Sequence, residues 1–306
     1  MEPPGDPQAT SPLEPLEPMP VAAAPPTQLG FPLRRETTTF DSALAYASEV
    51  WKKDLGVWVL AMLIAMMFLG GIPIALRIVA MSLGLPLEAD DLSPAAVGIE
   101  IVLYIVQVLI QGVAILGMYA MAFRGLHGHP ASINALFSQI RKVLKYVLQV
   151  LAIYMPLFFF VIVVVLVVAL VLVGTVNFDG KANDEFIKAL PALGITMLVT
   201  APLYIYFMLG VLFAPAELAL NDKAGPIQAI FTSWRVAHGK RWLILGASIV
   251  AGMISVLSMM LCFIPFLFGG PLALLFMSAL YLGLRKDAQF PEPNTTSVLG
   301  GVRRRQ

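Results

Sequence analysis

Long runs of apolar residues follow one another from residue 57 onward, and charged residues mark where each run ends. Six such runs occur, over residues 57–81, 97–123, 147–176, 190–216, 242–264 and 266–284. A bilayer core about 30 Å thick needs roughly 20 helical residues at 1.5 Å per residue, and five of the runs exceed that length. The pattern predicts an all-α integral membrane protein, with six transmembrane helices in a single domain over residues 37–286.

Lysine and arginine residues are distributed unevenly between the two sides of this predicted bundle. Of the 20, 17 lie near the two ends of the chain and in the connections after the second and fourth runs. Two others, Lys181 and Lys188, lie in a connection on the opposite side, and Arg77 lies inside the first run. Because basic connections stay in the cytoplasm, this distribution predicts that both termini are cytoplasmic.

Three stretches on the basic side have the period of an amphipathic helix. Apolar side chains recur every three or four positions in residues 133–147, with bases on the opposite face. Residues 227–235 repeat the pattern, and residues 40–51 repeat it more weakly. Since basic amphipathic helices lie flat at a membrane surface, we expect three cytoplasmic interfacial helices.

The interfacial stretches recur at a regular distance along the chain. The segment Ala135–Ser138 aligns with Ala229–Thr232, 94 residues later, and Ala45 lies 90 residues before Ala135. Each unit consists of an interfacial helix and two spans, a pattern consistent with a threefold internal repeat. We expect bases and tryptophans on this side to contact lipid headgroups. These residues are Arg141, Lys142, Lys145, Trp234, Arg235, Lys240, Arg241 and Trp242.

Composition agrees with a membrane protein and excludes other classes. Hydrophobic residues make up 58% of the chain and charged residues 13%, whereas a typical water-soluble domain has about 45–50% and about 25%. The net charge of +1 gives no attractive field for nucleic acid, and the single cysteine excludes a disulfide framework. Ten prolines in residues 1–33 predict a disordered cytoplasmic tail over residues 1–36, and residues 287–306 are predicted to form a disordered basic tail.

Two ionisable side chains fall inside predicted spans, where burial in hydrocarbon is costly. Arg77 lies near the outer end of the first run, and Glu100 lies just inside the outer start of the second. Both are roughly 5–6 Å deep on adjacent arms of one hairpin. Either they form an ion pair across the hairpin, or each side chain extends separately to the outer interface.

The second run carries a polar stripe that is expected to face away from lipid. Glu100, Tyr104, Gln107 and Gln111 fall within about 60° of one another on a helix. One interpretation is a pathway for a solute or proton, or a groove for a lipid headgroup. The other interpretation is hydrogen bonding between helices, which contributes about 0.6 kcal/mol per contact.

The remaining polar residues give little indication of chemistry. Glu217, at the inner end of the fourth run, is expected to be hydrated, with pairing to Lys223 or Arg241 as the alternative. His127 and His129 flank a glycine and need a third ligand to hold a metal, so a turn before a helix is the preferred interpretation. The sequence has no Walker A loop and no H-E-x-x-H or G-x-S-x-G motif. We therefore expect no catalytic residue, no metal and no cofactor.

The stretch from Ala224 to Trp242 carries a sequence motif in which Gly225-Pro226 is followed by Ala229 and Ser233-Trp234, and then by Gly239 and Trp242. It resembles the GP-x-x-A-x-x-x-SW…G-x-x-W signature of a broad, functionally uncharacterised group of bacterial polytopic membrane proteins. That group is similar to the membrane domain fused to some glycerophosphodiester phosphodiesterases. The resemblance covers residues 214–286 and implies a bacterial inner-membrane protein. No phosphodiesterase domain occurs in this sequence, so the resemblance carries no catalytic function.

These features favour a non-enzymatic scaffold or accessory protein. Its expected partners are membrane lipids, or a protein bound at the cytoplasmic face through the basic helices. The alternative is a transporter or channel for a small solute or lipid that uses the polar stripe of the second span.

Overall fold

The computed structural model describes residues 38–83, 94–175, 200–261 and 263–288, together with residues 194 and 198. Every element in these ranges is helical, which confirms the predicted all-α class. The ranges belong to one compact unit, Leu33–Gln306. The predicted tail over residues 1–36, most of the basic tail, and the outer residues Lys181 and Lys188 lie outside the described residues.

Six helical segments are long and apolar enough to cross a membrane, as the sequence predicts. They are Leu55–Ser82, Ala96–Leu126, Asn134–Leu166, Thr200–Leu220, Arg241–Met260 and Ile264–Lys286. The largest difference in boundary is in the third, which begins at Asn134 and not near residue 147. The structure therefore supports a multi-pass membrane protein.

The first span contains a turn of wider helix at its centre. Helix α2 (Leu55–Met66) continues into the π-helical segment η1 (Met67–Gly71) and then into α3 (Ile72–Ser82). Pro73 is the second residue of α3 and lacks the backbone N–H that an α-helix would bond to the carbonyl four residues earlier. A π-turn absorbs this irregularity without ending the helix.

The predicted interfacial helix over residues 133–147 is not one helix. The four residues Asn134–Phe137 form α5, the 3-10 turn η2 covers Ile140–Lys142, and the long helix α6 covers Val143–Thr175. The chain turns at Gln139, whose side chain is buried and whose φ of −100° departs from helical geometry. The start of the third candidate span is therefore divided into two short segments that precede α6.

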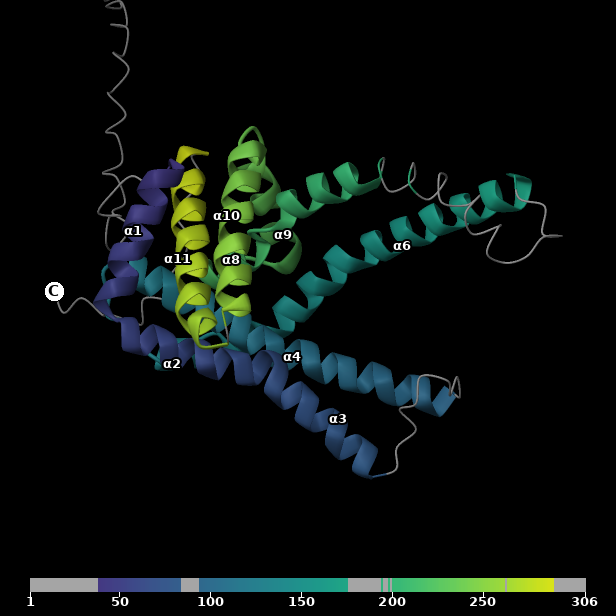
Figure 1. Ribbon diagram of the computed structural model, residues 1–306, viewed down its shortest axis with the longest axis horizontal. Helices are drawn as coiled ribbons and strands as arrows, with labels where there is room; N and C mark the ends of the chain where they lie inside the picture. The colour runs from purple at the N-terminus through teal and green to yellow at the C-terminus, as the bar shows by residue number, and fades with distance from the viewer. Residues whose placement is uncertain are drawn as a thin grey trace, which may run out of the picture. The chain divides into compact units, whose positions relative to one another are not determined.

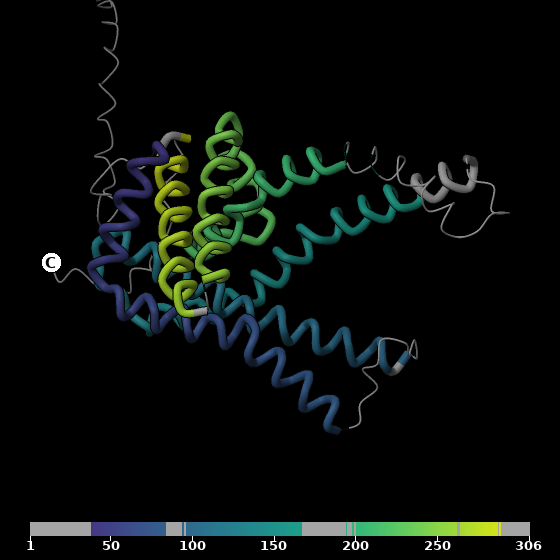
Figure 2. Tube along the Cα trace, viewed as in Figure 1, coloured from purple at the N-terminus to yellow at the C-terminus, as the bar shows by residue number. Residues whose placement is uncertain are grey.

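The last helix, α11 (Phe263–Asp287), packs against several others. The remaining helices are α1 (Phe40–Lys53), α4 (Pro94–Leu126), the helical residues 200–211, α8 (Ala214–Leu220), α9 (Pro226–Ala237) and α10 (Arg241–Met260). Helix α11 lies between α1 and α10 (Figures 1 and 2), and it also contacts α2 and α4. Its side chains Phe276 and Tyr281 join Trp58 and Phe123 in the buried core. Of the six candidate spans, it is the one most enclosed by protein.

Hydrogen bonds between segments join the basic ends of the first two spans. The Tyr46 hydroxyl of α1 donates to the carbonyl of Leu126, the last residue of α4. The Ala131 amide donates to Asp54 Oδ2 at 3.0 Å, just before α2. Both bonds satisfy polar groups where a helix starts or ends, so they hold these two ends together.

Helix α9 buries its hydroxyl side chains Thr232 and Ser233 and exposes two large apolar side chains. Phe231 is 63% exposed and Ile227 is similarly exposed, whereas Ser233 is fully buried. The Ser233 hydroxyl donates to the Gly210 carbonyl at 2.7 Å and accepts from the Phe213 amide at 3.1 Å. Since apolar side chains are stable against lipid and a hydroxyl needs partners, this orientation suits a membrane environment.

Candidate functional site

Arg77 and Glu100 form an ion pair between α3 and α4. The Arg77 Nη2 atom donates to Glu100 Oε1 at 3.0 Å and to Oε2 at 3.1 Å. The two side chains remain 61% and 42% exposed. The structure therefore shows the paired arrangement of the two that the sequence left open. A pair this open to its surroundings is available to a third group.

The rest of the polar stripe runs along α4 without being enclosed. Tyr104 is 60% exposed, and Gln107 and Gln111 are half-buried. The described part of the chain therefore leaves Tyr104 uncovered. Within the described part of the chain, the stripe follows one flank of a helix and no closed channel surrounds it. The outer residues 84–93 between α3 and α4 are not described.

Glu217 is buried and paired, which corrects the expectation that it is hydrated. Its side chain is only 2% exposed. Arg285 Nε donates to its Oε2 atom at 2.9 Å, and the Tyr281 hydroxyl donates to the same oxygen. Asn221 Nδ2 donates to Oε1 at 3.2 Å. Neither of the expected partners, Lys223 and Arg241, is the cation that neutralises it.

The partners of Glu217 come from one face of α11. Tyr281 and Arg285 are four residues apart, a spacing that places both side chains on the same side of a helix. Glu217 lies in the first turn of α8, which begins just before Pro215. A proline is well tolerated in the first helical turn, so Pro215 does not prevent α8 from forming. The carboxylate is thereby directed toward α11.

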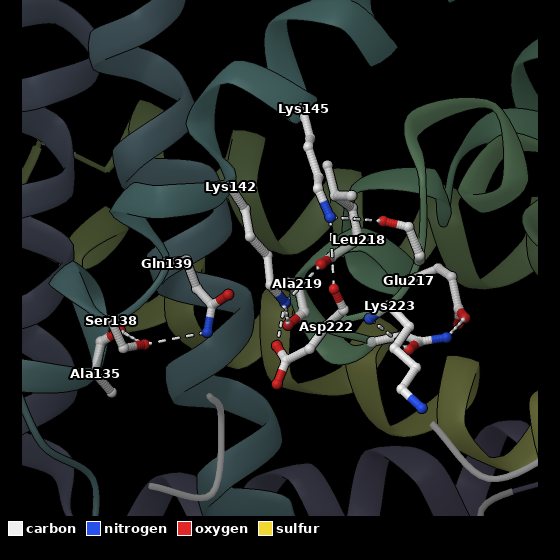
Figure 3. Close-up of polar contacts among 12 residues, drawn as sticks. Ala135, Ser138, Gln139, Lys142, Lys145, Glu217, Leu218, Ala219, Asp222 and Lys223 are labelled. Carbon is white, nitrogen blue, oxygen red and sulfur yellow. Dashed lines mark hydrogen bonds and ion pairs between the residues drawn. The ribbon is translucent and has the colours of Figure 1, made fainter. Parts of the chain in front are cut away.

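A second buried cation holds the other end of α8. Lys142 Nζ lies 2.8 Å from Asp222 Oδ1 and donates to the Leu218 and Ala219 carbonyls at 3.0 and 2.9 Å. These carbonyls lie in the last turn of α8, where backbone acceptors lack helical partners and a positive charge is favourable. Figure 3 shows the Lys142 side chain reaching from the start of the third span into this turn.

Lys145 extends the same arrangement. Its Nζ atom lies 3.3 Å from the Ala224 carbonyl and 3.5 Å from the Asp222 carbonyl. Figure 3 shows the Lys145 side chain directed toward Asp222. Lys142 and Lys145 were both expected to face lipid headgroups. The structure instead directs them to backbone carbonyls, because the start of α6 packs beside α8. Arg141, which precedes Lys142, is exposed.

Together these contacts form what we call the α8 network. It consists of Lys142, Glu217, Asn221, Asp222, Tyr281 and Arg285. Two buried cations face two acids, and the remaining donors reach carboxylate or carbonyl oxygens. A charge-balanced cluster of this kind favours a structural role, in which the ends of the third, fourth and sixth spans are held together.

A separate cation lies against two aromatic rings where α10 begins. The guanidinium carbon of Arg241 is 3.4 Å from the Tyr206 ring centroid and 4.8 Å from that of Trp234. Its three guanidinium nitrogens are buried and make no hydrogen bond within the described part of the chain. Cation–π contact stabilises the faces of the group but leaves its in-plane N–H donors without acceptors.

An apolar groove of about 300 Å³ adjoins the same two rings. Its walls come from α6, from the helical residues 200–211 and from α9. The lining residues include Pro156, Leu157, Phe160, Leu203, Tyr206 and Trp234. The groove could not be predicted from the sequence, because the α6 residues and residues 203–207 that line it are more than 40 positions apart.

The other predicted headgroup contacts on this side are Trp242, Arg235 and Lys240. All three are exposed.

The two neighbouring histidines have structural surroundings. His127 is buried and its Nδ1 atom donates to the Phe123 carbonyl at 2.7 Å. Burial lowers its pKa below the ordinary value of 6.5, although the carbonyl contact opposes the shift. Burial and the charge of Arg124 also lower the pKa of His129. The residues that the structure describes contain no group of three potential metal ligands.

Comparison of this chain with protein-family models, curated proteins and solved structures finds no match.

Proposed function

We propose that this chain is a non-enzymatic scaffold or accessory protein of a membrane, which binds lipid or a partner protein at its basic face. The basic face is defined by exposed lysine and arginine side chains. In the described part of the chain, leaving aside Arg77 at the other end of the first span, these are Lys52, Lys53, Arg141, Lys223, Arg235, Lys240 and Lys286. The observation that carries the proposal is the contrast between these outward bases and the two cations enclosed in the α8 network.

The basic face is proposed to be cytoplasmic, with both termini on that side of a bacterial inner membrane. The positive-inside bias supports this orientation, and the resemblance of residues 214–286 supports the bacterial assignment. Helices α1 and α9 are proposed to lie in the inner interface. Each directly precedes a span, as α5 and η2 precede α6, and this order supports the threefold repeat.

Topology mapping tests the orientation. Single cysteines placed at Arg141 and, as the opposite-side control, at Lys181 are labelled in intact cells with a membrane-impermeant maleimide, in a Cys262→Ser background. The residue 181 site is expected to react and the residue 141 site to react only after permeabilisation. The reverse pattern would show that the basic face is not cytoplasmic and would contradict the proposal that it binds a partner there.

A second candidate, a transporter or channel, is favoured by two features of the first hairpin. Its Arg77–Glu100 pair is exposed, and the π-turn at residues 67–71 is a type of irregularity often found at functional sites. Proteoliposomes with a pH-sensitive dye, a potential-sensitive dye or a fluorescent phospholipid separate the two candidates. A scaffold gives no flux above protein-free vesicles. Saturable flux that is lost in Glu100→Gln would establish the transporter.

A further inference from the structure

The groove beside Tyr206 and Trp234 has the properties of a lipid site. It is lined by aliphatic and aromatic side chains from α6, from residues 200–211 and from α9. Its volume of about 300 Å³ is at the lower end of the range of small-molecule sites. Within a membrane, an open apolar groove of this size suits a hydrocarbon chain. Shape and hydrophobicity by themselves do not select one lipid over another.

Arg241 supplies the selective feature. Tyr206 and Trp234 line the groove, and the same two rings pack against the Arg241 guanidinium at 3.4 and 4.8 Å. Arg241 is the first residue of α10, so it marks the end of a candidate span, where lipid headgroups are found. The charged group and the apolar groove are thus adjacent through shared side chains.

The Arg241 guanidinium has no hydrogen-bond acceptor among the residues that the structure describes. None of its three nitrogens makes a hydrogen bond within the described ranges, although the rings cover these atoms and the residue as a whole is half-buried. A buried cation is destabilising unless an anion and hydrogen-bond acceptors compensate it. A phosphate oxygen pair in the guanidinium plane would take two N–H donors at once, in the bidentate geometry that arginine favours.

The charge around Arg241 indicates the sign of the headgroup. Residues 223–242 contain four lysine and arginine residues and no acid. Lys240, the neighbour of Arg241, is exposed, and so is Arg235. These bases attract a net negative headgroup and repel the cationic end of a zwitterionic one.

We propose that this groove holds an acyl chain of an anionic phospholipid whose phosphate is bound by Arg241. The proposal deepens the proposed function and rests on its claim that the basic face binds lipid. It assigns Arg241, Tyr206 and Trp234 to the headgroup end, and Leu157, Phe160 and Leu203 to the chain.

Lipid retention tests the proposal with the full chain. The protein is reconstituted in nanodiscs of equimolar phosphatidylglycerol and phosphatidylcholine with identical acyl chains, and the lipids retained after mild detergent extraction are counted by native mass spectrometry. The wild-type chain is expected to retain phosphatidylglycerol preferentially. Arg241→Gln is expected to reduce that retention about tenfold, the effect of losing a charged hydrogen bond. The control Arg235→Gln removes one exposed base from the same region and is expected to change retention less than about threefold.

A second variant blocks the chain without altering charge. Leu157→Trp fills the groove and is expected to reduce retention while Arg241 remains in place. Melting temperature in detergent identifies a variant that fails to fold. If Arg241→Gln is such a variant, the Leu157→Trp result decides.

Three results would overturn the lipid site. They are equal phosphatidylglycerol retention in wild type and Arg241→Gln, an equal loss in Arg235→Gln, and full retention in folded Leu157→Trp. Millimolar inorganic phosphate is expected to leave the wild-type lipid in place. Displacement by phosphate would identify a free-anion site and would also reject the proposal. The dye-based flux measurements are independent of retention, so failure of the lipid site and failure of the scaffold function are distinguishable.

Discussion

Arg285 donates from Nε to Glu217 Oε2 at 2.9 Å, although the two residues are 68 positions apart in the chain. Both side chains are buried, and the Tyr281 hydroxyl completes the contact on the same oxygen. The bond joins the last span to the short helix that ends the fourth. The two opposite charges also neutralise each other, which lowers the cost of burying them within the protein.

Replacing Glu217 by glutamine is expected to destabilise the protein strongly. Arg285 would keep its buried charge and lose the carboxylate that balances it, a change that typically costs about 3–5 kcal/mol. The measurement is reversible unfolding in mixed micelles. Glu100→Gln is the matched control, because it removes a carboxylate from an exposed ion pair worth about 1 kcal/mol or less. The double variant Glu217→Gln/Arg285→Gln is expected to recover part of the loss. Equal effects of the two single variants would contradict a balanced buried pair.

Substitution by methionine is expected to change the stability of the protein much more at Lys142 than at its neighbour Arg141. Lys142→Met removes the cation that binds Asp222 and two α8 carbonyls. Because the buried acid and carbonyls then lack a partner, we expect the free energy of unfolding to fall by about 2–5 kcal/mol. Arg141→Met alters an exposed side chain and is expected to stay within about 0.5 kcal/mol. Both are measured by thermal unfolding in detergent. If Arg141→Met proves the more harmful, the assignment of Lys142 to the α8 network is wrong.

Two glycines of α4 predict opposite effects of an added methyl group. A Cβ on Gly117 would overlap the Leu136 carbonyl of α5, whereas a Cβ on Gly98 meets nothing within 4 Å. Gly117→Ala is therefore expected to lower the free energy of unfolding by about 1–3 kcal/mol through overpacking. Gly98→Ala is expected to gain up to about 1 kcal/mol from improved helix propensity. The comparison uses melting temperatures of the two purified variants. A neutral Gly117→Ala would show that α4 and α5 do not approach as closely as described.

The buried histidine after α4 predicts a dependence of stability on acidity. Because burial holds the folded-state pKa of His127 below 6.5, the unfolded chain takes up a proton first as the pH falls. The contribution of His127 is therefore complete above about pH 6.5 and is lost progressively below it. His129 shifts in the same direction. Melting temperatures recorded between neutral and acidic pH should fall less steeply in His127→Gln than in wild type.

The exposed His238 provides the control for this measurement. His238→Gln is expected to keep the wild-type slope of melting temperature against pH. A slope that is unchanged in His127→Gln but flattened in His238→Gln would contradict the assignment.

Features that depend on neighbouring residues were predictable from the sequence. The six apolar runs match six candidate spans, because hydrophobicity over about 20 residues is a local property. The Arg77–Glu100 pair was among the predicted arrangements, since both residues lie near the turn of one hairpin and helical rise places them at similar depth.

Partners distant in the chain were decided only by the tertiary structure. Glu217 was expected to be hydrated because it lies at the polar end of a span, yet the packing of α11 beside α8 buries it against Arg285. Lys142 was expected at the lipid surface because it lies on the polar face of a periodic stretch. The break at Gln139 and the proximity of α8 direct it inward.

The sequence by itself determined that this chain is helical and apolar enough to cross a membrane six times, because those properties follow from periodicity and composition. The tertiary structure decided which charges are enclosed and which remain outward, and it brought Arg241 to the rings that line the groove. The physical reason is that a charge in a low-dielectric environment is governed by the few groups within hydrogen-bonding distance. In a helical bundle those groups come from helices that are far apart in the chain.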